Sequence, residues 1–246
     1  WVPKILQKHR ATLGPQASDA AFEATIVATL DQLQTRTAVL SLANATMAPG
    51  TAAFDVTVQN LTGHKFPSGY PSRRAWIRVR IFDRQNQVLW ESGGFDDAGD
   101  IAGETIAQPL PHLLHVDSAD QVQIYEGVLG DEHSNSTVAL LHADQYFKDN
   151  RLLPKGWRSD HEDIEYIRPV GPEDDENFVG GSDTIGYSAT FEGTPAKIEV
   201  SLHYQALGNR WIRELLRVPT ADVQAFGGMW KSIDRRPVTI SSATFP

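Results

Sequence analysis

The chain of 246 residues contains no cysteine. This absence excludes disulfide bonds, thiolate metal sites and a cysteine nucleophile. It also excludes covalently attached haem within the chain, because c-type attachment requires the motif Cys-x-x-Cys-His. The chain must therefore fold and act without thiol chemistry of its own.

Basic residues and long apolar runs are scarce as well. The chain has 22 Lys and Arg residues against 31 Asp and Glu residues, a formal net charge of −9. Nucleic-acid-binding proteins typically carry a basic patch or stripe, and none is visible, so we expect no nucleic-acid partner. An acidic surface instead favours docking with basic or cationic partners. No run approaches the roughly 18 apolar residues of a membrane-spanning helix, so we expect no membrane span.

Motifs of the common enzyme classes are also missing. The sequence has no Gly-x-Ser-x-Gly elbow, no phosphate-binding loop, no dinucleotide fingerprint and no His-Glu-x-x-His. Carboxylates such as Asp163 and Glu165 are present, but their spacing does not place them across a cleft. We therefore expect no catalytic activity from this chain alone.

Hydrophobic residues make up 41% of the chain, which is enough for a packed core. Residues 1–17 predict an irregular lead-in, and Ser18 is a favoured N-cap for a helix that follows. Apolar residues then recur at helical spacing, at Phe22, Ile26, Leu30 and Leu33. We expect residues 1–37 to form this lead-in and a helix that packs on the remainder.

After residue 37 the apolar period changes from helical to alternating, which is typical of half-buried strands. About nine short strands are predicted, at Val39–Ala43, Phe54–Val58, Ile77–Ile81, Val88–Trp90, Val122–Val128, Ile164–Arg168, Ile185–Phe191, Ile198–Tyr204 and Val238–Ile240. No helices alternate with them, which favours a mainly β fold, an antiparallel β-sandwich (Ig-like or jelly-roll-like) over residues 38–246. A short helix is predicted after Thr220, interrupted at Gly227 and Gly228, and His203 is expected on the polar face of its strand.

The segment Asn60–Trp76, NLTGHKFPSGYPSRRAW, joins two predicted strands and predicts a rigid aromatic loop. It resembles the pattern Asn-x-Thr-Gly-His-Lys-aliphatic-Pro-Thr/Ser-Gly-Tyr-Pro, found downstream of the haem motifs in many bacterial multihaem c-type cytochromes. The resemblance spans most of residues 19–160 and includes VLWESGGFDDAG, QVQIYEGVLGD and YFKDNRLLPKGW. Phe66 and Ser68 stand where Leu and Thr are commoner in that family.

The resemblance implies the haem-free C-terminal β-sandwich region of a multihaem c-type cytochrome-like protein. Its implied role is a non-catalytic accessory domain in electron transfer, which packs on a haem-bearing portion or subunit and shields it. Haem c would then lie on an upstream or neighbouring portion, and a redox partner protein would dock with the assembly. The chain opens on Trp1 without an initiator Met, so we expect an upstream part. The expected location is periplasmic or extracellular, in a bacterium.

Five residues of this segment are candidate haem contacts: His64, Lys65, Tyr70, Arg73 and Arg74. Imidazole can coordinate haem iron, so His64 could supply the sixth ligand to the haem of a neighbouring domain. The alternative is that His64 bonds to nearby backbone and holds the turn. Lys65 could neutralise a haem propionate, or it could simply be solvated.

Two acidic loops could hold calcium, which favours six to eight oxygen ligands. One contains Asp96, Asp97, Asp100 and Glu104. The other, Glu173–Asp183, is expected to be a solvated surface loop, and neither loop has EF-hand spacing. His112 and His115 lie in a proline-rich segment that predicts extended backbone. In such backbone they point to opposite faces, which favours a structural or haem-edge role over zinc binding.

The same sandwich admits an alternative function. A secreted carbohydrate- or ligand-binding module, stabilised by calcium, could stack sugars on exposed aromatic side chains. Most of the tryptophans, however, alternate with polar residues in predicted strands and are expected to anchor the core.

Overall fold

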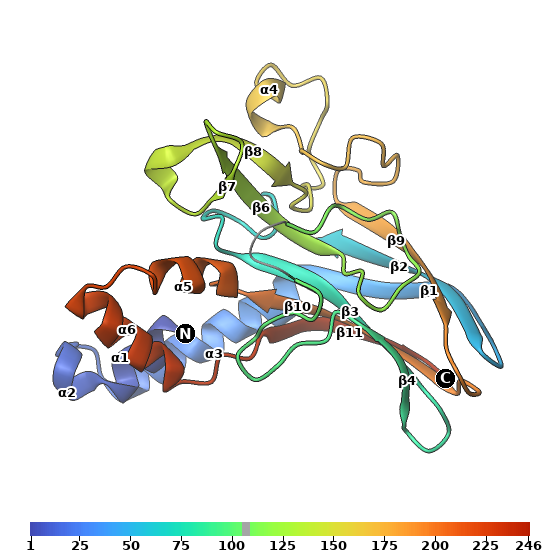
Figure 1. Ribbon diagram of the computed structural model, residues 1–246, viewed down its shortest axis with the longest axis horizontal. Coiled ribbons are helices and arrows are strands. Elements are labelled where there is room, and N and C mark those ends of the chain that lie inside the picture. Colours follow the sequence, from blue (N-terminus) through green and yellow to red (C-terminus); the bar gives the residue numbers. More distant parts are fainter. Residues whose placement is uncertain (105–108) are drawn as a thin grey trace.

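A computed structural model describes residues 1–104 and 109–246 of the chain. The fold is mainly β and sandwich-like, as predicted, with helices at the N-terminal and C-terminal sides (Figure 1). The strands are β1 (Ala38–Ala48), β2 (Thr51–Asn60), β3 (Arg74–Phe82), β4 (Val88–Ser92), β5 (His115–Val116), β6 (Ile124–Asp131), β7 (Ser136–Thr137), β8 (Ala143–Asp149), β9 (Ser182–Thr190), β10 (Lys197–Gln205) and β11 (Val238–Phe245). The helices are α1 (Val2–Lys8), α2 (Arg10–Leu13), α3 (Asp19–Arg36), η1 (Leu140–His142), α4 (Ile164–Ile167), α5 (Asn209–Leu215) and α6 (Ala221–Lys231).

The strands form two sheets. One has the order β1-β2-β9-β5, and the other has the order β11-β10-β3-β6-β7, with β4 paired to β3 and β8 paired to β6. Every strand pair is antiparallel except the short pair of β5 with β9. The alternating positions of both sheets supply one main core, which includes Phe54, Val56, Val58, Ile77, Val79, Ile81, Ile185, Tyr187, Ile198, Val200 and Leu202. The period-2 pattern of the sequence thus fixes which side chains are buried.

A second, smaller core lies on the other face of the larger sheet, where the chain after β4 folds back over it. Trp76 is fully buried there, and its indole Nε1 donates to the Gly93 carbonyl at 3.0 Å. Gly93 has φ of +71°, and a Cβ on it would lie 2.3 Å from the carbonyl oxygen of Ile77, so this reversal requires glycine. The same layer covers His203, which is 4% exposed and packs on Trp76 and Phe95. His203 therefore projects from the side of β10 that carries Glu199 and Ser201, as predicted, but this part of that face is covered.

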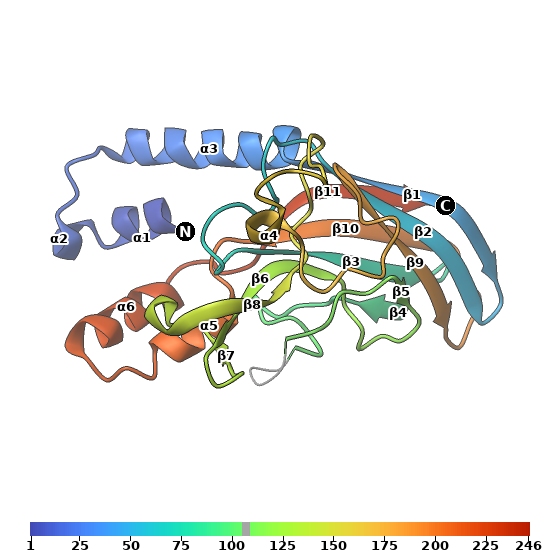
Figure 2. The same cartoon turned by 90° about the horizontal axis from the view of Figure 1, so that it is seen from above.

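Helices α1, α2, α5 and α6 gather at one end of the molecule, whereas α4 lies beside the sheets (Figures 1 and 2). Ile5 of α1, Ile212 of α5 and Trp230 of α6 share an apolar cluster that joins the N-terminal helix to the two helices that precede β11. The Ser18 side chain caps α3 as predicted, accepting from the Ala21 N–H at 3.2 Å. No helix in the described part of the chain combines the length and apolar character needed to cross a membrane.

Several predicted boundaries were wrong. The described residues contain eleven strands rather than about nine, and the lead-in is largely helical in α1 and α2. The predicted strand Ile164–Arg168 is the short helix α4 instead. Helix α6 continues through Gly227 and Gly228, because its Thr220 cap and the buried Trp230 stabilise it on both sides of them.

Candidate functional site

The loop that carries the family resemblance connects β2 to β3, and the side chain of Asn60 holds it in place. Asn60 is 3% exposed, and its Nδ2 donates to the carbonyl oxygens of His64, Leu152 and Leu153 at 2.8, 3.1 and 3.1 Å. Its Oδ1 accepts from the N–H of Thr62 at 2.9 Å. One buried amide therefore joins the start of the loop, its centre and a distant segment.

His64 lies exposed on this loop with one ring nitrogen already occupied. Its Nδ1 lies 3.0 Å from the backbone oxygen of Lys65 and 3.3 Å from the Thr62 hydroxyl. A carbonyl oxygen only accepts, so Nδ1 carries the hydrogen and Nε2 keeps its lone pair. This is the tautomer in which a histidine can bind a metal through Nε2 while a backbone bond orients the ring. The backbone bond expected in the alternative interpretation is thus present, and it is compatible with the ligand role.

A groove of about 540 Å³ separates this loop from α3, and His64 lies on its wall. Phe66 and Tyr204 also line the groove, and their rings stack with centroids 6.0 Å apart. Arg73 lines it as well, with its Nη1 bonded to the Ser68 carbonyl at 2.9 Å. The opposite wall is formed by polar and apolar residues of α3: Thr25, Ala28, Thr29, Gln32 and Leu33. The groove therefore combines aromatic surface, an imidazole and a guanidinium.

Lys65 points elsewhere, into an ion-pair cluster. Its Nζ lies 2.7 Å from Asp149 Oδ2, and Arg151 Nε lies 2.6 Å from Asp149 Oδ1. Burial lowers the pKa of Lys65 despite this partner. Burial opposes the ionisation of Asp149, but the bonds and charges of Arg151 and Lys65 still hold its pKa below the usual range. Lys65 is therefore committed to Asp149 rather than solvated.

Arg74 is also committed to the fold. It is 3% exposed and donates to Glu104 Oε2 at 2.5 Å, to Gln205 Oε1 at 2.8 Å and to the Gly99 carbonyl at 3.3 Å. Tyr70, by contrast, is 49% exposed, with its ring centroid 5.2 Å from that of Trp211. Of the five candidate haem contacts, His64 and Arg73 thus line the groove.

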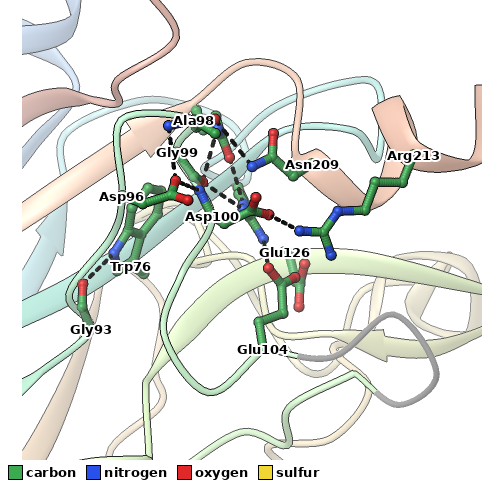
Figure 3. A network of polar contacts seen from close by, with 12 residues as sticks. Trp76, Gly93, Asp96, Ala98, Gly99, Asp100, Glu104, Glu126, Asn209 and Arg213 are labelled. Carbon is green, nitrogen blue, oxygen red and sulfur yellow. Dashed lines mark hydrogen bonds and ion pairs between the residues drawn. The ribbon is translucent and has the colours of Figure 1, made fainter. Parts of the chain in front are cut away.

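The loop proposed for calcium is organised by its own backbone and by arginines (Figure 3). Asp96 Oδ1 accepts from the N–H groups of Ala98 and Asp100, both at 2.9 Å. Asp100 accepts from Arg213 at 2.6 Å, while Glu104 is held by Arg74. Asp96, Asp100 and Glu104 thus already have partners, and calcium binding by Asp96, Asp97, Asp100 and Glu104 stays a prediction.

The second acidic loop was predicted to be solvated, which is wrong for two of its residues. Asp175 and Asp183 are buried, and Asp175 Oδ2 lies 2.9 Å from His112 Nε2. His112 Nδ1 accepts from the side-chain amides of Gln123 and Asn150 at 2.8 and 3.1 Å. Backbone N–H groups hold the oxygens of both amides, which fixes their orientation.

This arrangement decides what His112 can do. Because Nδ1 accepts two bonds, Nε2 carries the hydrogen and donates it to Asp175. His112, Asp175 and Asp183 offer donor atoms within 4.8 Å of one another, but the imidazole has no free lone pair for a metal ion. Burial lowers the pKa of His112, which keeps the ring neutral. The contacts assign His112 a structural role, and His115, on the opposite face, is exposed.

Asp183 on β9 is the most unusual group of this network. It is fully buried, and its Oδ2 accepts from the Tyr125 hydroxyl at 2.8 Å. Its Oδ1 has no hydrogen-bond partner among the described residues. Burial raises the pKa of Asp183 from 3.8 to about 7, with the negative charge of Asp175 adding to the effect. The sequence singles out the acidic loop but not the burial of Asp183 or its pairing with Tyr125, because Tyr125 is distant along the chain.

Comparison with known proteins found similarity in structure. No family model matches the sequence, and no curated protein matches it significantly. The structure is similar to that of a penta-heme cytochrome c552 from Thermochromatium tepidum, with a TM-score of 0.51 and 16% sequence identity. The similarity covers 88% of this chain and 41% of the cytochrome chain, so this chain spans less than half of that protein's length. At this identity the likeness shows a shared fold.

Proposed function

We propose that this chain is a haem-associated accessory module of a multihaem c-type cytochrome-like electron-transfer protein. The observation that carries the proposal is the groove beside α3, where His64 has its Nδ1 tied to the backbone and its Nε2 left to accept a bond. The similarity to a penta-heme cytochrome, of which this chain covers 41%, supports the same role. The chain has no cysteine, so haem c would be carried by an upstream or neighbouring portion.

The groove residues fit the edge of a haem in three respects. The stacked rings of Phe66 and Tyr204 offer a flat apolar surface. Arg73 offers a guanidinium suited to a propionate carboxylate. The imidazole of His64 is a normal axial ligand for haem iron. Haem supplies the redox chemistry when bound, and the chain's own residues would hold it and exclude water.

In this role the module works in the periplasm or outside a bacterial cell, and a redox partner protein docks with the assembled haem-bearing portion. The acidic surface of the module, with its net charge of −9, favours a partner with basic residues around its own docking site.

The test is a titration of the chain with a c-type haem peptide that has one vacant axial position. Coordination by a second imidazole converts the iron to its low-spin form, so the Soret band shifts and the shift saturates. We expect His64→Ala to weaken this binding at least tenfold. The matched control is His142→Ala, which removes another exposed histidine that lies outside the groove. Equal affinity of the His64→Ala variant and the unaltered chain would refute the assignment of His64.

A further inference from the structure

A second cavity lies away from the groove, between α5 and the strands β7 and β8. Its volume is about 570 Å³. Residues 134–139, which include β7, form one wall, and Arg210, Glu214 and Arg217 form the other. Figures 1 and 2 both show α5 beside this end of the larger sheet. None of the residues that line the groove beside α3 lines this cavity.

Arg210 is the buried charge of this cavity. The residue is only 9% exposed, yet its side chain has no hydrogen bond or ion pair with any residue in the described part of the chain. The side-chain nitrogen and oxygen atoms that are both fully buried and without a hydrogen-bond partner belong to other residues. The guanidinium nitrogens of Arg210 have no partner, so they must be accessible to solvent. The guanidinium therefore meets solvent inside the cavity.

Nearby buried cations are neutralised, which makes Arg210 an exception. Arg74 is paired with Glu104 at 2.5 Å, and Lys148 with Glu126 at 3.5 Å. Burial lowers the pKa of Lys148, and the positive charge of Arg210 lowers it further. Two of the three cations, Arg74 and Lys148, are therefore neutralised by described carboxylates, and the positive charge of Arg210 is not.

The obvious internal partner for Arg210 is already used. Glu214 lies one helical turn further along α5, but it pairs with Arg217 at 2.6 Å. A buried charge without a partner is costly, and a guanidinium presents five donors in a planar fork that matches an oxyanion. The hydroxyl groups of Ser134, Ser136 and Thr137 on the facing wall add further donors.

We propose that this cavity is a binding site for a small oxyanion, such as phosphate or the carboxylate of an organic acid, with Arg210 as its anchor. The anion makes paired bonds to the Arg210 guanidinium and further bonds to the hydroxyl groups of the facing wall. It thereby neutralises a charge that the fold leaves unbalanced. The site is independent of the proposed haem association, because His64 takes no part in it.

The test measures the melting temperature of the chain at pH 7 and constant ionic strength while phosphate, or in a second series succinate, replaces chloride. A ligand that binds only the folded chain raises the melting temperature, by about 5–10 °C at a hundredfold excess over Kd for a chain of this size. The rise should saturate with phosphate, with succinate or with both. The responding series identifies the preferred anion.

Arg210→Met removes the charge and keeps most of the side-chain stem, and it should abolish the saturable rise. The matched control is Arg213→Met on the same helix, whose guanidinium bonds to Asp100 instead, and it should retain the rise. If Arg210→Met does not fold, calorimetric titration of the unaltered chain with the two anions decides. Absence of a saturable response to both anions, or an unchanged response in Arg210→Met, overturns the proposal.

Discussion

The buried carboxyl of Asp183 should make the free energy of unfolding fall as pH rises from acidic to weakly alkaline values. Burial raises its pKa from 3.8 to about 7 in the folded chain. Between these values the folded chain keeps a proton that the unfolded chain has released, so folding is favoured by acid. The contribution is complete below pH 3.8 and is lost as pH rises through about 7.

The magnitude follows from the pKa shift. Each unit of pKa is worth about 1.4 kcal/mol, so the shift of Asp183 corresponds to about 4 kcal/mol in all. About 2–3 kcal/mol of this falls between pH 5 and pH 8. His112 acts in the opposite direction in acid, because burial keeps it neutral and protonation below its ordinary pKa favours unfolding. The effect of Asp183 must therefore be isolated by substitution.

Asp183→Asn keeps an oxygen that can accept from the Tyr125 hydroxyl but cannot ionise. Urea denaturation gives the free energy of unfolding of the variant and of the unaltered chain at each pH. The variant should gain about 2–3 kcal/mol on the unaltered chain between pH 5 and pH 8. Asp174→Asn, which changes an exposed carboxyl of the neighbouring loop, should show no such trend. A difference between Asp183→Asn and the unaltered chain that stays constant with pH refutes the reasoning.

Two substitutions test the loop and its exit. Asn60→Ala removes the amide that donates to three carbonyl oxygens, so we expect a loss of about 1–3 kcal/mol in unfolding free energy, whereas Gln59→Ala on the exposed face of β2 should change it little. Arg74→Met removes the buried guanidinium and leaves the Glu104 carboxylate, which is only 15% exposed, without its partner, so it should cost about 3–5 kcal/mol by urea denaturation. Arg36→Met, which removes a solvent-exposed pair, should stay within about 0.5 kcal/mol, and an equal effect of the two arginine variants would contradict the role of burial.

Alternation of apolar and polar residues predicted the strands that lie at the centre of each sheet. In β10, Ile198, Val200 and Leu202 are buried as the pattern indicates. The pattern failed where burial depends on a third layer, as at His203, which the segment after β4 covers. It also failed for β8, whose two buried residues, Lys148 and Asp149, are charged and show no alternation with apolar ones.

The candidate site could be predicted only in part, because contacts between distant segments determine which of its side chains are free. The composition of the loop marked it as rigid, and two residues that line the groove, His64 and Arg73, were among the candidates. The partners of Lys65 and Arg74, Asp149 and Glu104, are far away along the chain, so the sequence alone could not show that these cations are internally paired.

The buried amide of Asn60 determines at which step the loop loses its conformational entropy. Fixing the backbone costs about 1–2 kcal/mol of entropy per residue, and here the chain meets that cost as it folds. A partner docking at His64, as proposed, would meet a surface ordered in advance, so little of its contact energy would be spent on immobilising the loop. The same bonds reach Leu152 and Leu153 in the main core, so the loop and the sandwich should melt as one cooperative unit.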